Sequence, residues 1–152
     1  MKSGMAKPII VLTVICLITS AALAVTNSKT EGAIKKVNKQ IIADAKAQVL
    51  PKGTEGDAYT GVAKSFGGDL TLMVGIDKSG KITGVTVTSH HDTPGLGTKA
   101  MTPQYLSQYK GLTELKADSI KKDPQVQAVT GATISSNGIY HAIQNAMKEA
   151  KK

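Results

Sequence analysis

The chain has 152 residues, a net charge of +8 and only 3% aromatic residues, and its basic residues are all lysines. Nucleic-acid-binding proteins rely on Arg for bidentate contacts with phosphate and guanine, and on aromatic rings for base stacking. This composition argues against nucleic-acid binding, and the length leaves room for one domain with a short additional segment.

The first predicted element is an apolar, uncharged run at residues 8–25, which follows a short tail at residues 1–7. A helix of that length spans about 27 Å, close to the roughly 30 Å of a bilayer core. A retained membrane anchor and a signal peptide cleaved after Ala22-Leu23-Ala24 both fit, and the length favours the anchor. Because lysines flank the run on both sides, charge leaves its orientation open.

A connecting segment follows at residues 26–52. Its apolar residues recur at helical spacing between Thr30 and Val49, which predicts an amphipathic helix. The sequence Leu50-Pro51-Lys52-Gly53 contains the residues that end helices, so this helix is expected to stop there.

Residues 53–152 are expected to form the folded domain. Three runs predict short strands at Tyr59–Ser65, Leu70–Ile76 and Ile82–Thr88. Glycine-containing turns at Gly67–Asp69 and Asp77–Gly80 separate them, and Asp first with Gly last is typical of a type I turn. This pattern predicts an antiparallel meander.

The second half of the domain predicts two helices and a further strand. Thr102-Pro103 is typical of a helix start, and Val126–Val129 predicts a last short strand. Apolar residues at i, i+3, i+4, i+7 and i+8 predict a closing helix over Gly138–Met147. The predicted fold class is α+β, with one N-terminal transmembrane helix followed by an antiparallel sheet and flanking helices.

The segment Thr130-Gly131-Ala132-Thr133-Ile134-Ser135-Ser136 lies between the last predicted strand and the closing helix. Small residues and backbone N–H groups at a helix N-terminus suit a phosphate. Because the segment lacks Lys and spaced glycines, it favours a flavin phosphate over a nucleoside triphosphate. From spacing alone, an ordinary hydroxyl-rich turn with Ser136 or Asn137 as helix N-cap is the favoured interpretation, because such turns before helices are common.

A second loop, His90-His91-Asp92-Thr93-Pro94-Gly95-Leu96-Gly97, follows the third predicted strand. Three adjacent side chains in an extended chain seldom converge on one ion, so no metal site is expected at His90-His91-Asp92. A hydrolase triad is also disfavoured, because the sequence has no Gly-x-Ser-x-Gly elbow.

With these two motifs in this order, the chain resembles the FMN-binding G subunit of Rnf-type ferredoxin:NAD oxidoreductases. It is also similar to a relative of that protein, the C subunit of sodium-pumping NADH:quinone oxidoreductase. The resemblance covers most of the chain and implies that FMN is bound covalently, through a phosphoester with the Thr133 hydroxyl. It further implies that the other cofactor-binding residues are Thr130, Gly131, Ala132, Ser135, Ser136, His90, Thr93, Gly95, Leu96 and Gly97.

Two positions depart from the family pattern. Asp92 stands where the pattern has Glu, which is a conservative change. Gln127 stands where the target motif of the flavin transferase begins with an acidic residue, six positions before the modified Thr133.

The resemblance implies a membrane-anchored electron-transfer subunit of an ion-translocating oxidoreductase complex, not an independent catalyst. Its expected partners are the other membrane and redox subunits of that complex, and a flavin transferase during maturation. The resemblance places the N-terminus in the cytoplasm and the flavin domain on the extracytoplasmic side. The alternative is an anchored or secreted module of the same fold that holds FMN non-covalently, or no flavin, and acts in complex assembly.

Overall fold

The computed structural model describes residues 6–51 and 53–152, so most of the tail at 1–7, and Lys52 in the predicted stop signal, lie outside the described residues. The chain forms two compact units, one ending at Gln40 and one running from Ile41 to Lys152. The second unit thus begins earlier than the domain start expected at residue 53.

Helix α1 (Ala6–Val49) joins the predicted anchor and the predicted amphipathic helix in one uninterrupted element. No proline falls between Pro8 and Pro51, so nothing in this stretch removes a helical hydrogen bond. The large apolar side chains of its first half are exposed. The helix contains an 18-residue window of mean hydropathy 2.6, so by length and composition it fits a single-pass membrane anchor.

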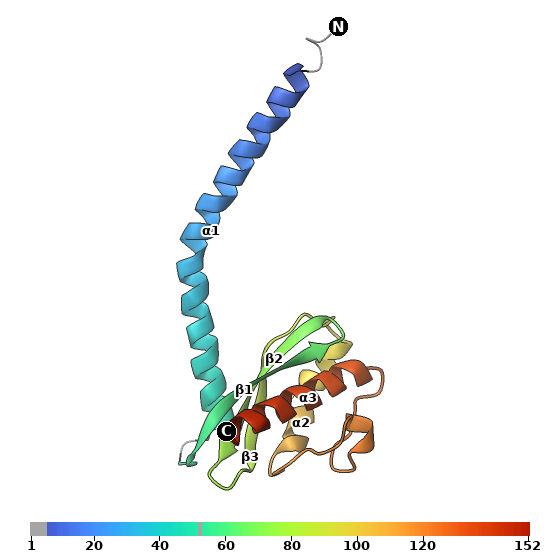
Figure 1. Cartoon of the computed structure of the whole chain (residues 1–152). Coiled ribbons are helices and arrows are strands. Elements are labelled where there is room, and N and C mark those ends of the chain that lie inside the picture. The colour runs from blue at the N-terminus through green and yellow to red at the C-terminus, as the bar shows by residue number, and fades with distance from the viewer. Residues whose placement is uncertain (1–5, 52) are drawn as a thin grey trace. The chain divides into compact units, whose positions relative to one another are not determined.

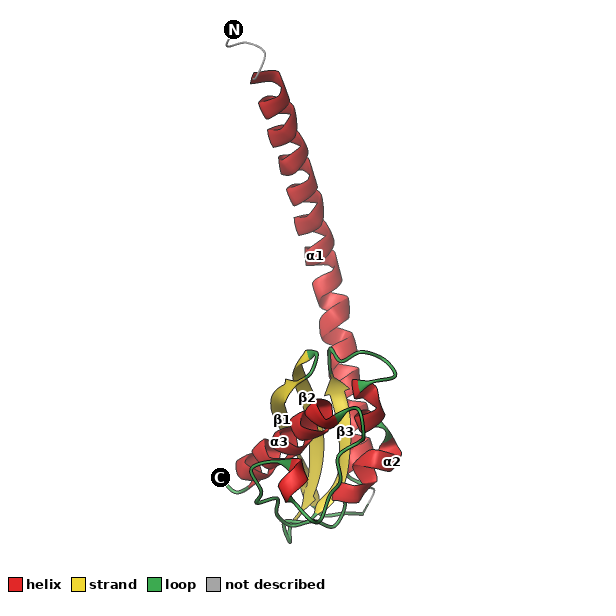
Figure 2. Cartoon of the chain, turned by 90° about the vertical axis from the view of Figure 1, so that its right-hand side faces the viewer, coloured by secondary structure: helices red, strands yellow, loops and turns green. Residues whose placement is uncertain are grey.

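The second unit is built on a three-stranded antiparallel sheet with strand order β1-β2-β3 (Figure 2). The strands are β1 (Gly56–Ser65), β2 (Gly68–Asp77) and β3 (Ile82–Ser89). Each strand pairs with the next along the chain, which confirms the predicted meander.

One face of the sheet carries the main core. Helix α3 (Thr133–Ala150) lies across β1 and β2, as Figure 1 shows. Alternate side chains of β2, among them Leu72 and Val74, are fully buried with Ile139 and Ile143 of α3. Every second side chain of β2 therefore packs against the apolar face of α3, which is the face predicted for the closing helix.

The opposite face of the sheet receives the last turns of α1. Ala45 and Val49 form a small buried cluster with Met73. Gly75 and Gly84 make room for this contact, since a Cβ at either position would collide with the backbone of Val49. The end of α1 is thus an integral part of the second unit.

The predicted strand at Val126–Val129 is wrong, because this segment is irregular. Its backbone bonds to side chains instead of to a neighbouring strand. Gln127 N–H donates to Gln108 Oε1 at 2.8 Å, and Gln108 Nε2 donates back to the Gln127 carbonyl at 3.3 Å. Val129 N–H donates to Ser136 Oγ at 3.0 Å. The backbone groups of Gln127 and the Val129 N–H thus find side-chain partners without a ladder.

Both helix starts in this half are now defined. Helix α2 (Pro103–Leu106) begins as predicted, with Thr102 Oγ1 accepting from Tyr105 N–H at 3.3 Å. Helix α3 begins at Thr133, before the predicted start at Gly138, and its N-cap is Ala132. The hydroxyl-rich segment therefore forms the first turn of α3, and the alternative N-caps Ser136 and Asn137 lie inside the helix.

Candidate functional site

A cavity of about 310 Å³ opens at the N-terminal end of α3. That volume is at the lower end of the range of small-molecule sites in proteins. Three segments line it: the β1–β2 turn, the loop after β3, and the start of α3. The lining residues are Phe66, Thr93, Leu96, Gly97, Gly131, Ala132, Thr133, Ile134 and Ser135.

The start of α3 offers free backbone donors to this cavity. The first N–H groups of a helix have no acceptor within the helix, and no side chain caps this one. Gly131 has φ +81°, a left-handed conformation that glycine adopts without strain. The positive end of the helix dipole therefore faces a space that suits an anion.

The hydroxyl groups of residues 130–136 lie in different surroundings. Thr133 is half-buried and lines the cavity, whereas Thr130 is exposed and is not among the lining residues. Ser135 and Ser136 are both buried. Ser136 Oγ accepts the Val129 N–H, so this hydroxyl stabilises the preceding loop and does not line the cavity.

The loop after β3 also divides into lining and non-lining residues. Thr93, Leu96 and Gly97 line the cavity, while His90 and Gly95 are exposed and outside the lining set. The loop is held locally, since Gly95 N–H donates to the Thr98 hydroxyl at 2.9 Å and Leu96 N–H to the Thr93 carbonyl at 3.2 Å. Within residues 6–51 and 53–152, no three metal-ligating side chains gather in one place.

Two lining residues were missed by the sequence reasoning. Phe66 and Ile134 are 69% and 59% exposed, and with Leu96 at 57% they place three large apolar side chains around the cavity. Phe66 is the only Phe in the chain and directly precedes the predicted turn at Gly67–Asp69, so a large aromatic residue beside a glycine turn was the available signal.

Asp92 was not predicted as a site residue, yet it is only 4% exposed. Its Oδ1 accepts hydrogen bonds from the Ser65 hydroxyl and the Gly67 N–H. Burial raises the pKa of Asp92, but the Ser135 and Ser65 hydroxyls and the Gly67 N–H favour the charged form, so the pKa lies below its ordinary value. Asp92 is therefore a buried carboxylate at neutral pH.

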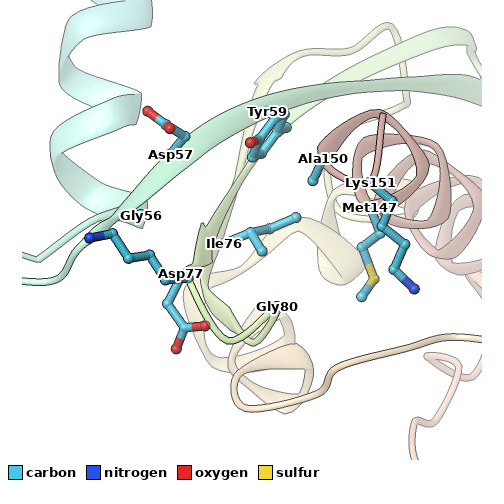
Figure 3. Close-up of a pocket in the computed structure, with 10 residues that line it drawn as sticks. Gly56, Asp57, Tyr59, Ile76, Asp77, Gly80, Met147, Ala150 and Lys151 are labelled. Atoms are coloured by element: carbon cyan, nitrogen blue, oxygen red, sulfur yellow. The ribbon is translucent and has the colours of Figure 1, made fainter.

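A second hollow, of about 260 Å³, lies at the opposite end of β1, β2 and α3 (Figure 3). It is lined by Tyr59, Ile76, Asp77, Met147, Lys151 and neighbouring residues. This hollow is next to the C-terminal end of α3, where helix carbonyl groups disfavour an anion. The two motifs singled out in the sequence both lie at the other end.

A family model, the FMN-binding domain, matches residues 65–148. That range includes both loops and all three segments that line the first cavity. The chain belongs to the FMN-binding domain family, and the resemblance and the α+β fold class expected from its sequence are confirmed.

The curated relatives are components of ion-translocating oxidoreductases. The G subunit of such a complex from Methanosarcina acetivorans is 27% identical over 93% of this chain and 92% of its own length. The G subunit of the Na⁺-translocating ferredoxin:NAD⁺ oxidoreductase complex from Acetobacterium woodii is 26% identical, over 88% of this chain and 86% of its own. The crystal structure of NqrC from Shewanella oneidensis aligns with a TM-score of 0.46 and 26% identity, covering 61% of this chain and 47% of that one.

Proposed function

We propose that this chain is the G-type subunit of an ion-translocating ferredoxin:NAD oxidoreductase complex and carries FMN on the Thr133 hydroxyl. The observation that carries the proposal is the placement of Thr133. It is the first residue of α3, it lines the cavity, and no side-chain hydrogen bond caps the helix N-terminus beside it.

A phosphate on Thr133 suits this position for two reasons. The free N–H groups of the first turn can donate to its oxygens, and the helix dipole favours its negative charge. Thr130 immediately precedes Gly131 and is exposed, and we propose its hydroxyl as a further donor although it does not line the cavity. In forming the link, Thr133 Oγ bonds to phosphorus, the P–O bond to the leaving group of the flavin nucleotide donor breaks, and that leaving group takes up the hydroxyl proton. Compared with free FMN and free protein, the product is lighter by one water.

The apolar residues around the cavity suit the flavin ring system. Phe66, Leu96 and Ile134 present exposed hydrophobic surface that a planar aromatic group would cover. When bound, FMN supplies the electron-transfer chemistry, while the protein positions the ring and excludes water from it. A covalent link prevents loss of the cofactor from a domain in dilute surroundings.

Helix α1 is proposed to anchor this carrier, with the flavin domain on the extracytoplasmic side. The exposed apolar side chains of its first half support a lipid environment. Maturation then requires a flavin transferase that acts on an accessible segment. Gly131 is exposed, and Gln127, which departs from the transferase motif, is exposed as well, its backbone bonded to Gln108.

The test is the intact mass of the chain co-expressed with a flavin transferase, with in-gel fluorescence after denaturation. The expected result is a mass increment of FMN minus water, on the peptide that contains Thr133. Thr133→Val should abolish both signals, and Thr113→Val, an exposed threonine outside both motifs, should leave them unchanged. An unmodified wild-type chain would favour the alternative, a module that binds FMN non-covalently or not at all.

A further inference from the structure

The cavity depends on three segments that are far apart in the sequence. The first contributes Phe66, the second contributes Thr93, Leu96 and Gly97, and the third contributes residues 131–135. None of the lining residues belongs to a strand; Gly97 begins a short 3-10 helix, and residues 133–135 form the start of α3. Their relative placement comes from the packing of α3 on β1 and β2 and from contacts between the three segments themselves.

Asp92 connects all three segments. Its Oδ1 accepts from Ser65 and Gly67, the two residues that flank Phe66. Asp92 itself immediately precedes the lining residue Thr93. Its second oxygen, Oδ2, is directed toward the third segment, where it lies close to Ser135.

The position of Oδ2 is defined by Gly97. A Cβ built on Gly97 would collide with Asp92 Oδ2, and the same Cβ would lie 2.7 Å from Ser135 Oγ. The carboxylate oxygen and the serine hydroxyl therefore flank one small space behind a glycine that lines the cavity. Among the described residues Oδ2 has no hydrogen bond of standard geometry, and the Ser135 hydroxyl is the donor beside it.

We propose that Asp92 is the positioning residue that assembles the flavin cavity, and that the Ser135 hydroxyl is its partner, not a ligand of the phosphate. This inference rests on the proposed function, since it assigns the occupant of the cavity as FMN. The carboxylate holds the β1–β2 turn, the loop after β3 and the first turn of α3 in the arrangement that receives the ring.

A carboxylate suits this role better than a neutral group. Hydrogen bonds to a charged acceptor are about twice as strong as neutral ones, and one carboxylate can accept from several donors. A negative charge near the N-terminus of α3 is also favourable. Loss of the side chain would leave the Gly67 N–H and the Ser65 and Ser135 hydroxyls without their acceptor in a partly buried place.

The charge has a consequence for the cofactor. A fixed negative charge close to the cavity disfavours the addition of electrons to a group bound there. Asp92→Asn, which keeps the shape of the side chain and removes its charge, should therefore shift the midpoint potential of bound FMN to a more positive value. A residue that only maintained the fold would not produce this shift.

The experiment uses the full chain with FMN attached by co-expression with a flavin transferase. Intact mass measures attachment, and fluorescence anisotropy and iodide quenching measure how firmly and how deeply the ring is held. In Asp92→Ala the FMN should remain attached, the anisotropy should fall toward that of free FMN, and iodide quenching should rise. Ser65→Ala should give a smaller change in the same direction, and it provides the test if Asp92→Ala does not fold by circular dichroism.

Asp77→Ala is the matched control, because Asp77 also anchors a turn but lies at the opposite end of the sheet. It should leave anisotropy, quenching and potential unchanged. The inference is overturned if the Asp92 variants keep a normally held ring and the wild-type potential. An unmodified wild-type chain would instead overturn the covalent function.

In that second case, titration of free FMN into Thr133→Val and Thr133→Val/Asp92→Ala proteins still decides the role of Asp92. A rise in Kd of about tenfold or more in the double variant supports it, as expected for the loss of a charged hydrogen-bond network. An equal Kd in both proteins overturns it.

Discussion

Two aspartates anchor turns at opposite ends of the sheet, and they do so over very different distances along the chain. Asp77 Oδ1 accepts from the N–H groups of Ser79 and Lys81, two and four residues away. Asp92 Oδ1 accepts from Ser65 and Gly67, which are 27 and 25 residues away. The first carboxylate shapes one turn, whereas the second joins separate segments into a cavity.

The two aspartates differ in whether their hydrogen bonds stabilise one turn or hold together segments that are distant in the sequence. A carboxylate that bonds its own turn can be removed at a local cost, because the strands on either side pair independently. A carboxylate that bonds distant segments controls whether these segments meet at all. Variants at the Asp92 end should therefore change the flavin site, and matched variants at the Asp77 end should change stability alone.

The largest effect is expected from Gly97→Ala. Its Cβ would meet Asp92 Oδ2 and Ser135 Oγ, so the carboxylate and the hydroxyl must separate. We expect a loss of about 1–3 kcal/mol in the free energy of unfolding, as for other overpacked sites. The anisotropy of covalently attached FMN should fall as well. Urea unfolding and fluorescence measure the two effects.

Gly80→Ala is the matched control for that variant. A Cβ there meets nothing within 4 Å, but the φ of +80° strains any side chain. The expected cost is about 1 kcal/mol with no change in the flavin signal. If both glycine variants released the ring equally, the distinction between the two ends would be lost.

Acid should produce the next-largest effect on the flavin. The pKa of Asp92 lies below the ordinary value of 3.8, where the Ser135 hydroxyl is the strongest influence opposing burial. Its contribution to stability is therefore present above the unfolded-state pKa and is lost as the pH falls through the lower folded-state pKa. The anisotropy of the attached FMN should therefore decrease when the pH is lowered below about 4.

The control for the acid titration is a comparison of the Asp77→Asn and Asp92→Asn variants. The pKa of Asp77 is also lowered, by the Ser79 hydroxyl and the Lys81 N–H. Asp77→Asn should keep the acid step in the flavin signal, and Asp92→Asn should remove it. An acid step that survives in Asp92→Asn would assign the transition to another group.

A loss of stability without any change in the flavin signal is expected from Tyr140→Phe in the middle of α3. Its hydroxyl donates to Asp123 Oδ2 at 2.7 Å and accepts from the Ala117 N–H at 3.1 Å. Burial and the bond to Asp123 raise the pKa of Tyr140 to about 12. Removal should cost about 1–3 kcal/mol in urea unfolding, because a buried carboxylate oxygen loses its donor.

The matched control is Tyr59→Phe, at the end of the sheet with the second hollow, for which we expect a change within about 0.5 kcal/mol. The FMN anisotropy should be unchanged in both tyrosine variants. A large fall in Tyr140→Phe would mean that the loop before Gly131 also positions the ring.

The smallest effect is expected from Asp77→Ala. It removes the hydrogen bonds from Ser79 and Lys81, but the turn is exposed and Gly80 N–H still donates to the Asp77 carbonyl at 3.0 Å. Thermal unfolding should show a small decrease in melting temperature and no change in FMN attachment or anisotropy. A loss of attachment would contradict the assignment of this end as structural.

Elements governed by neighbouring residues were predictable from the sequence. The Asp77–Gly80 turn, the Thr102-Pro103 helix start and the three-stranded meander all follow the expected pattern. The segment Val126–Val129 failed because its hydrogen bonds go to side chains of Gln108 and Ser136. Local β propensity carries no information about such partners.

For the site, the two loops could be predicted from the sequence, through Thr133 and the Thr93–Gly97 segment. Both loops are rich in small residues, hydroxyl groups and glycine, which are the residue types that suit a bound phosphate or flavin. The sequence could not supply Phe66, which becomes a neighbour of these loops only when β1 and β2 pair. Nor could it show that Asp92 turns inward to Ser65 and Gly67. Periodicity and turn chemistry act over a few residues and therefore fix helices, strands and turns, whereas the cavity depends on contacts across some 25 residues or more, which exist only in the packed chain.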